Sequence, residues 1–253
     1  MAHDGLILEV DGLSRYFGAL AALNDVSFAV RRGEIFSVIG PNGAGKSTLF
    51  NVISGLHAPS AGRVRLDGAE ITGLPPEAIN RRGLAKTFQI TNVFPGMSVY
   101  DNVCVAAQSR AAASGRVSSL WRRTPIDTRS EELLAAFGLA SRRDELARSL
   151  SHGEQRYLEI CLALATEPRL LMLDEPTAGM TPGETKDATA LIKRIAQQRG
   201  LTLLLIEHDM SVVMGISDRI AVLHFGEKIA EGAPEAIRSD TKVIEAYLGP
   251  GDD

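Results

Sequence analysis

The stretch GPNGAGKST, residues 40–48, restricts the possible folds more than any other part of this 253-residue chain. It follows the apolar segment EIFSVIG and precedes a helical pattern marked by Leu49, Val52, Ile53 and Leu56. The spacing matches G-x-x-x-x-G-K-[ST], a loop between a strand and a helix that cradles phosphate groups in α/β proteins. The helix N-terminus beside such a loop also favours a negative charge. We therefore expect residues 40–48 to bind the phosphates of a nucleotide.

Each residue type in this loop has a chemical reason to be there. The glycines let backbone N–H groups approach phosphate oxygens without a Cβ in the way. Lys46 supplies a positive charge for the β- and γ-phosphates, and the hydroxyl of Ser47 is suited to ligating Mg²⁺. The expected ligands are thus ATP and Mg²⁺. The predicted nucleotide-binding residues are Gly40, Pro41, Asn42, Gly43, Ala44, Gly45, Lys46, Ser47 and Thr48.

The segment LLMLDEP, residues 170–176, predicts the second half of this site. An apolar strand that ends in two carboxylates places them at the C-terminal edge of a parallel sheet, where nucleotides bind. Asp174 is predicted to lie on the metal side, behind the direct ligands of Mg²⁺. Glu175 is the candidate base that polarises the attacking water, and Glu175 and Lys46 are predicted catalytic residues.

The pattern along the chain changes twice. Short strands separated by turns are predicted up to about residue 70, helices from about residue 98 to 166, and strands again in RLLMLDE and LTLLLIEHD, with a helix between them. Uniformly apolar strands that alternate with helices indicate a parallel sheet buried on both faces. The stretch RIAVLHFGEKIAEG predicts a hairpin that turns near Gly226 and Glu227.

Composition excludes several classes of protein. The net charge is −4, so no basic field favours nucleic acid as a partner. Cys104 and Cys161 have no metal or redox spacing, and we expect both to be reduced and buried. No apolar run approaches the ~18–20 residues of a membrane span, and the start MAHDGLILEV has no basic region typical of an export signal. A cytoplasmic protein is expected.

Residues 109–130 do not fit a packed element, because they are rich in Ser, Ala and Arg, with five arginines against one aspartate. Two interpretations remain open. The segment is either a solvated connector in the helical region or a basic contact with a membrane surface or a partner. No site is predicted there.

The stretch LSHGEQ, residues 150–155, also has two interpretations. Ser151 and Glu154 fit the S-x-x-E capping box, in which each side chain satisfies a backbone N–H of the first helical turn. The same N–H groups could instead bind an anion.

The motifs taken in order resemble those of the ATP-binding cassette (ABC) ATPases over almost the whole chain. LSHGEQ is similar to the signature of that family, usually LSGGQ, with His152 in place of a glycine and Glu154 in place of the glutamine. The resemblance implies that Ser151, Gly153 and Glu154 face the γ-phosphate of a nucleotide bound to a second copy of the fold.

The resemblance implies further site residues. Gln89 matches the glutamine that reaches Mg²⁺ and the water, and His208 matches the histidine that contacts the γ-phosphate. Phe17 matches the aromatic residue that stacks on adenine, with Tyr16 as the rival. TAGMTP, residues 177–182, lies where a loop between subunits belongs, although Thr181 replaces the usual aspartate there.

The resemblance also implies the fold class. We expect one ABC ATPase domain over residues 1–253, in the α/β class, with a P-loop NTPase (RecA-like) core around a mostly parallel sheet. An N-terminal antiparallel β region and an inserted α-helical subdomain complete it. Residues 1–90 and 160–253 are predicted to form the catalytic core, and residues 91–159 the helical subdomain with the signature.

Local strings such as KTFQITNVFPGMSVYDNV and VIEAYLG look like those of ATPase subunits of branched-chain amino acid importers. The implied partners are a second ATPase subunit (identical or a paralogue), transmembrane permease subunits and, indirectly, a periplasmic or other extracytoplasmic solute-binding protein. The implied location is peripheral, on the inner face of the cell membrane. Two alternatives stay open: a lipopolysaccharide-export ATPase, and a soluble ABC ATPase not coupled to transport.

The apolar cluster directly after Gln89 lies in a polar, turn-rich segment. It is interpreted either as a docking groove for a transmembrane partner or as ordinary packing of the helical subdomain. The cluster consists of Val93, Phe94, Pro95 and Met97.

Overall fold

The strands of the computed structural model, which describes residues 5–87, 93–113 and 125–248, form two sheets. An antiparallel sheet has the order β2-β1-β4-β5, with β1 (Leu6–Phe17), β2 (Leu20–Arg31), β4 (Ala61–Leu66) and β5 (Ala69–Glu70). A larger sheet has the order β10-β9-β3-β8-β7-β6. Its strands are β3 (Ile35–Ile39), β6 (Leu84–Lys86), β7 (Leu170–Asp174), β8 (Thr202–Ile206), β9 (Arg219–His224) and β10 (Glu227–Gly232).

The larger sheet is parallel except for its edge strand β10, which pairs antiparallel with β9. Every residue of β3, β7 and β8 is buried, which explains why four of the five residues in each strand are apolar. Alternate residues of β7 serve different cores, because side chains alternate across a strand. Leu171 and Leu173 pack toward the helices α3–α6, whereas Leu170 and Met172 pack toward the antiparallel sheet. The predicted α/β class and the mostly parallel sheet are confirmed.

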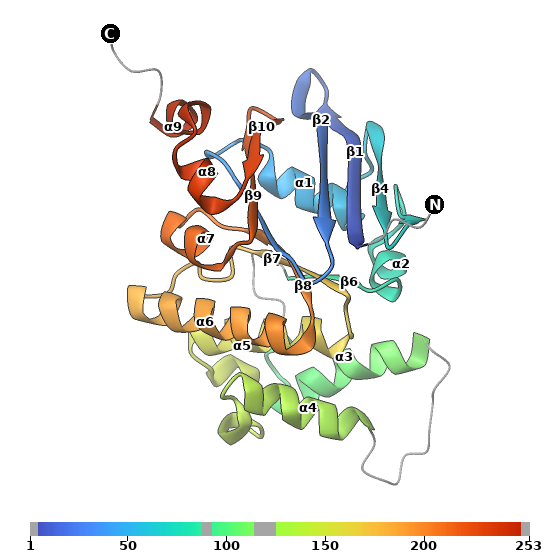
Figure 1. Cartoon of the computed structure of the whole chain (residues 1–253). Coiled ribbons are helices and arrows are strands. Elements are labelled where there is room, and N and C mark those ends of the chain that lie inside the picture. Colours follow the sequence, from blue (N-terminus) through green and yellow to red (C-terminus); the bar gives the residue numbers. More distant parts are fainter. Residues whose placement is uncertain (1–4, 88–92, 114–124, 249–253) are drawn as a thin grey trace.

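Helices cover the larger sheet and extend beyond it at one end (Figure 1). Those of the first half are α1 (Lys46–Ile53), α2 (Pro76–Arg81), α3 (Val99–Ala113) and α4 (Pro125–Ala136). The others are α5 (His152–Ala165), α6 (Pro182–Arg199), α7 (Met210–Ile216), α8 (Pro234–Arg238) and α9 (Thr241–Leu248). Figure 1 shows α3 and α4 at the lower end, opposite the antiparallel strands β1, β2 and β4. The boundary expected at residue 159 falls inside α5, so this helix extends across it.

The prediction for residues 109–130 is wrong at both ends. Helix α3 continues to Ala113, and α4 begins at Pro125; residues 114–124 lie outside the described part. Alanine-rich sequence has a high helix propensity, and proline is favoured at the first helical position. Ser130 is fully buried in α4, so this end of the segment is packed, not solvated. The sequence analysis also placed Leu56 in the helix after the loop 40–48, which is wrong. Helix α1 ends at Ile53, and Leu56 is 43% exposed.

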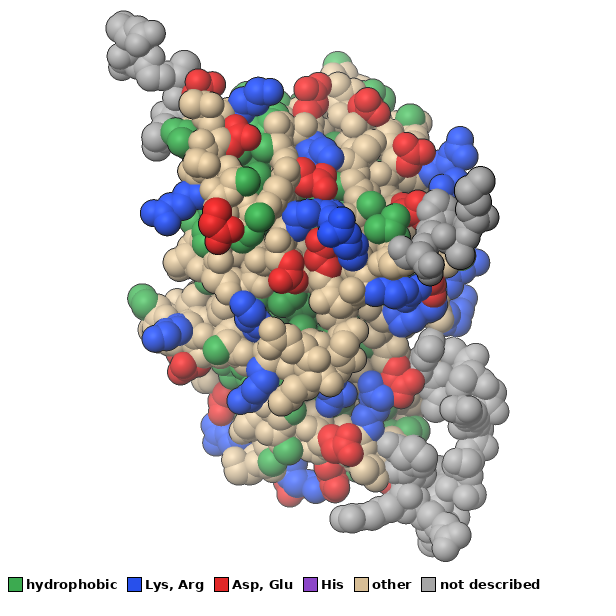
Figure 2. Space-filling model, viewed as in Figure 1, with side chains coloured by type: hydrophobic (Ala, Val, Ile, Leu, Met, Phe, Trp, Pro, Cys, Tyr) green, Lys and Arg blue, Asp and Glu red, His purple; other side chains and the backbone are tan. Residues whose placement is uncertain are grey.

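Other sequence-based expectations agree with the structure. Cys104 and Cys161 are both buried and unbridged, and burial raises the pKa of the Cys161 thiol. The hairpin turns at Phe225 and Gly226. Among the described residues, no helix is both long and apolar enough to cross a membrane. Figure 2 shows acidic and basic side chains interspersed over one face, in line with the small net charge.

Candidate nucleotide site

The loop 40–48 connects β3 to α1 at the C-terminal edge of the larger sheet. A Cβ on Gly40 would meet the carbonyl oxygen of Leu223 at 2.1 Å, and one on Gly45 would meet that of Ala22 at 2.5 Å. Both glycines also have positive φ, so no other residue fits either position without strain. Gly226 further holds the loop, because its N–H donates to the carbonyl of Ala44 at 3.0 Å. The loop is therefore shaped by close contacts with β2 and with the β9–β10 hairpin.

Lys46 lies at the start of α1 with its ammonium held across this loop. Its Nζ donates to the carbonyl oxygens of Gly40 at 2.7 Å and Pro41 at 3.0 Å. Burial lowers the pKa of Lys46, and the nearby charges of Glu175 and Asp174 oppose that shift. The structure thus brings together the two halves of the site that the sequence predicted, although Lys46 and Asp174 are 128 positions apart along the chain.

Asp174 ends β7 and is 4% exposed. Burial raises its pKa, while Lys86 opposes the shift with an ammonium 3.7 Å from Oδ2. Lys86 also donates to Oδ1 of Asn51 at 2.7 Å, which joins β6 to α1. The sequence analysis did not predict Lys86 as a site residue. The available signal was a lysine at the end of a short apolar segment, three residues before Gln89.

Glu175 follows Asp174 with a backbone conformation that is uncommon for a residue other than glycine, at φ 49°. Its N–H donates to the carbonyl of Ile206 at 2.9 Å, which fixes the end of β7 against β8. The carboxylate Oε1 lies 3.8 Å from Nδ1 of His208, whose side chain is 62% exposed. The candidate base and the candidate histidine therefore face each other beside the loop.

The helix start at LSHGEQ forms the capping box that the sequence suggested. The hydroxyl of Ser151 accepts from the N–H of Glu154 at 3.3 Å, and the carboxylate of Glu154 accepts from the N–H of Ser151 at 2.8 Å. Arg142 adds a contact from its Nε to Oε1 of Glu154 at 3.2 Å. The first turn of α5 is exposed at Ser151 and His152 and half-buried at Gly153. Glu154 is thus held as a carboxylate with its charge compensated.

We expect acid to remove the contribution of this capping box to stability. The N–H of Ser151, aided by Arg142, lowers the pKa of Glu154, and Thr181 lowers that of Glu184 in the equivalent box of α6. A depressed carboxyl pKa stabilises the fold above the unfolded-state value of about 4.3 and loses that effect as the pH falls through the folded-state value. The melting temperatures of Glu154→Gln and Glu184→Gln should therefore lie below that of the wild type at neutral pH and converge with it below about pH 4. A gap that stays constant on acidification would contradict this assignment.

A buried arginine, which the sequence reasoning missed, joins α5 to the end of β7. Arg156 is 4% exposed and donates to Glu159 Oε2 at 2.6 Å, to the carbonyl of Asp174 at 2.6 Å and to that of Glu175 at 2.8 Å. A charged pair spaced i, i+3 on the apolar face of a helix was the available signal. Arg156 ties the helix that begins at Ser151 to the two acidic residues.

The remaining predicted residues are less fully placed. Gln89 lies outside the described residues. Phe17 is 42% exposed at the end of β1, with the guanidinium of Arg15 4.5 Å from its ring centroid and His57 at its edge. Its rival Tyr16 is 45% exposed, so exposure does not separate the two candidates.

The donor set fits Mg²⁺ held partly by phosphate. Within the described residues, no three His, Cys, Asp or Glu side chains form a metal cage. Mg²⁺ is commonly bound by only one or two side chains together with substrate phosphates. The exposed hydroxyl of Ser47 and the carboxylate of Asp174 are hard oxygen donors of this kind.

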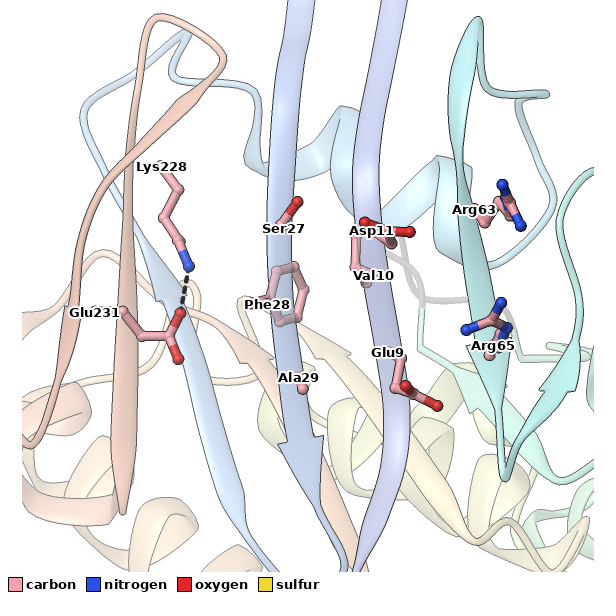
Figure 3. A pocket seen from close by; sticks show the side chains of 10 residues that line it. All are labelled: Glu9, Val10, Asp11, Ser27, Phe28, Ala29, Arg63, Arg65, Lys228 and Glu231. Carbon is pink, nitrogen blue, oxygen red and sulfur yellow. Dashed lines mark hydrogen bonds and ion pairs between the residues drawn. The ribbon is translucent and has the colours of Figure 1, made fainter. Parts of the chain in front are cut away.

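A cavity of about 500 Å³ lies elsewhere, on the outer face of the antiparallel sheet. Figure 3 shows acidic and basic side chains around it, with an ion pair between Lys228 and Glu231. Glu9, Asp11, Arg63 and Arg65 also line it, so positive charges do not dominate as a triphosphate site would require. The loop 40–48 therefore remains the candidate nucleotide site, in preference to this cavity.

A central parallel strand that leads into a glycine-rich loop, with two carboxylates at the same sheet edge, defines a P-loop nucleoside triphosphatase. Residues 23–178 match the family model described as ABC transporter, and residues 227–251 match one described as branched-chain amino acid ATP-binding cassette transporter. The chain therefore belongs to the ABC transporter family, and it is an ATPase subunit of that family.

Individual relatives agree with this assignment. The chain is 45% identical over 251 residues to a high-affinity branched-chain amino acid transport ATP-binding protein of Pseudomonas aeruginosa, covering 96% of this chain and 98% of the relative. It is 43% identical to the protein of the same description in Escherichia coli, with the same coverage. A solved ATP-binding cassette of an ABC transporter, in its ADP conformation, has a TM-score of 0.85 at 32% identity and covers 97% of this chain and 99% of its own.

Proposed function

We propose that the protein is the ATP-hydrolysing subunit of an importer for branched-chain amino acids, and that it works as a pair with a second such subunit. The observation that carries the ATPase mechanism is the meeting of Lys46, Asp174 and Glu175 beside one glycine-rich loop. The near full-length similarity to branched-chain amino acid transport proteins supports the cargo class.

The residues have distinct roles in this proposal. The loop 40–48 holds the phosphates, with Lys46 exchanging its carbonyl partners for the β- and γ-phosphates of ATP. Glu175 accepts a proton from the attacking water, and His208 contacts the γ-phosphate from the end of β8. Phe17 stacks on the adenine. Mg²⁺, when bound through Ser47 and Gln89 with Asp174 behind them, supplies neutralisation of the phosphate charge.

The signature helix serves the nucleotide of the partner subunit. Among the described residues, no hydrogen bond or ion pair joins residues 150–155 to residues 40–48, although both segments are well suited to phosphate. Ser151, Gly153 and Glu154 would complete the site of the second copy when the pair closes. ATP contacts made from both sides exist only in the closed pair, so ATP shifts the equilibrium toward closure. In this proposal the helical subdomain moves relative to the catalytic core when the pair closes, and the boundary between them lies outside α5, which continues past residue 159.

The segment after Gln89 forms the contact with the permease subunits. Phe94 is 50% exposed and Pro95 is exposed, whereas Val93 and Met97 are half-buried. The fully buried Asn102 holds this segment, since its side-chain amide donates to the carbonyls of Phe94 at 3.1 Å and Ser98 at 2.8 Å. Its Oδ1 accepts from the N–H of Phe94 at 2.7 Å. An exposed aromatic residue on a pre-organised backbone is a favourable anchor for a partner.

A Phe94→Asp variant should lose binding to the permease subunits and retain the ATPase activity of the isolated chain. The charge would have to be desolvated in an apolar interface, which weakens binding by about 2 kcal/mol or more. Co-purification with the membrane subunits measures the effect, and Val105→Asp on α3, 39% exposed, is the matched control. Normal membrane association and transport by Phe94→Asp would contradict the docking role.

Reconstitution tests the function as a whole. The tagged chain is purified with the membrane subunits that accompany it and placed in vesicles with its binding protein and internal ATP. Uptake of labelled leucine, isoleucine and valine, absent with Lys46→Ala, is the expected result. Hydrolysis with no accompanying membrane subunit, or export of a lipid-linked substrate, would overturn the importer assignment.

A further inference from the structure

A buried carboxylate lies directly after β8, and the proposed function gives it no role. Glu207 is 1% exposed and lies between Ile206, the last residue of that strand, and His208. Its Oε1 accepts two hydrogen bonds from Thr177, from the hydroxyl at 2.6 Å and from the N–H at 3.1 Å. Its Oε2 accepts from the N–H of His208 at 3.3 Å. Glutamate is seldom buried so completely, so its burial here depends on these partners.

Thr177 belongs to the loop 175–181, which leads from the end of β7 to α6. The far end of the loop is fixed by Thr181, which caps α6 in a capping box with Glu184. Within the loop, the N–H of Ala178 donates to Glu175 and that of Met180 to Thr177. For residues 176–180, the hydrogen bonds among described residues that leave the loop are those from Thr177 to Glu207.

Together with the backbone, these contacts form a small closed ring that includes the candidate base Glu175 and the candidate histidine His208. Glu175 lies two residues before Thr177, with Pro176 between them, and His208 lies directly after Glu207. The hydrogen bonds of Thr177 to Glu207 close one side of the ring. The approach of Glu175 Oε1 to His208 Nδ1, at 3.8 Å, closes the other side. The chain segments that carry Glu175 and His208 are therefore linked through Thr177 and Glu207.

We propose that Glu207 is a positioning residue for ATP hydrolysis, which through Thr177 holds Glu175 and His208 in one geometry beside the phosphate loop. The inference rests on the proposed function, since it assigns the reaction to Glu175. Loss of the link leaves the loop 40–48 and its phosphate contacts intact, so we expect only a small change in ATP binding. Misdirection of a catalytic group by a fraction of an ångström lowers the turnover rate instead.

A matched pair of variants separates positioning from stability. Thr177→Val removes the hydroxyl while keeping the shape and the N–H of the residue. Thr202→Val makes the same change at the other end of β8, where a 1% exposed hydroxyl accepts from the N–H of Gly33 at 2.9 Å. Both substitutions remove one buried hydrogen bond, so both should lower the melting temperature to a similar extent. Only Thr177 belongs to the ring.

Phosphate release by the full chain, measured over a range of ATP concentrations well below the melting temperature, tests the proposal. Thr177→Val should lower kcat about tenfold with KM for ATP within about twofold of wild type, as expected for a transition-state effect. Thr177→Ser, which keeps the hydroxyl, should restore kcat, and Thr202→Val should leave it unchanged. Glu207→Leu, which removes both acceptor oxygens, should lower kcat at least as much as Thr177→Val.

Equal kcat for Thr177→Val, Thr202→Val and wild type would overturn the proposal and leave the link as packing alone. If Thr177→Val does not fold, Glu207→Leu provides the test, because Leu removes the oxygen that accepts both hydrogen bonds of Thr177. Wild-type kcat for Glu207→Leu would then overturn the proposal. Lys46→Ala and Glu175→Gln run in the same assay. Normal hydrolysis by those two variants would refute the proposed function itself, whereas their inactivity with a normal Thr177→Val would refute only the role of Glu207.

Discussion

A Glu175→Gln variant is expected to bind ATP and to hydrolyse it about 10²–10⁴-fold more slowly than the wild type, the usual contribution of a general base. The amide has nearly the same shape as the carboxylate but does not accept the proton of the attacking water. The backbone at Glu175 is held by Ile206 and by Arg156, so the substitution should not displace the end of β7. Nucleotide binding by fluorescence and phosphate release under saturating ATP measure the two effects separately.

Glu167 offers a matched control for this experiment. It also has a positive φ, at 55°, and lies before the opposite end of β7, where its side chain is 54% exposed. Glu167→Gln should hydrolyse ATP at the wild-type rate. Glu175→Gln should also accumulate as an ATP-bound pair in gel filtration, because the contacts that close the pair persist without hydrolysis. Turnover within about threefold of wild type would show that Glu175 is not the base.

An Arg156→Ala variant is expected to lose about 3–5 kcal/mol of unfolding free energy, the range found when one partner of a buried ion pair is removed. The substitution takes away the 2.6 Å contact to Glu159 and the donors to the carbonyls of Asp174 and Glu175. Urea denaturation of the full chain measures the loss. Arg143→Ala is the control, because its ion pair with Glu131 is 41% and 35% exposed, and exposed pairs contribute little to stability.

The double variant Arg156→Met, Glu159→Leu distinguishes stability from alignment. Replacing both charged partners by apolar residues often restores stability, since no buried charge is left without its partner. The carbonyls of Asp174 and Glu175 would still lack the guanidinium. We therefore expect stability to recover, while ATP hydrolysis is slower than in the wild type because the end of β7 is no longer held by Arg156. Recovery of hydrolysis together with stability would show that Arg156 only balances Glu159.

The parts of the fold predicted correctly depend on local signals. The glycine loop between a strand and a helix, the apolar strands 170–174 and 202–206, and the capping box at Ser151 are each specified by a few neighbouring residues. The prediction for residues 109–130 was wrong because it relied on composition. Helix propensity and the proline at position 125 instead determine where α3 ends and α4 begins.

The parts of the site that were missed depend on contacts between distant segments. Arg156 and Asp174 are 18 residues apart, Thr177 and Glu207 are 30 apart, and Lys86 and Asp174 belong to different strands. Each of the charged residues Arg156, Lys86 and Glu207 interrupts an apolar pattern. Only the folded structure shows which distant group each of these residues contacts.

The place of β3 between β8 and β9 has a consequence for biosynthesis. A ribosome that has translated residue 60 has already made the whole phosphate loop, but both flanking strands and Gly226, which braces Ala44, are still missing. The loop can take its final shape only after Gly226 has been made, when about nine tenths of the polypeptide has been translated. Until then a nascent chain carries the motif without the capacity to capture nucleotide, so premature termination before the β9–β10 hairpin yields an inert fragment.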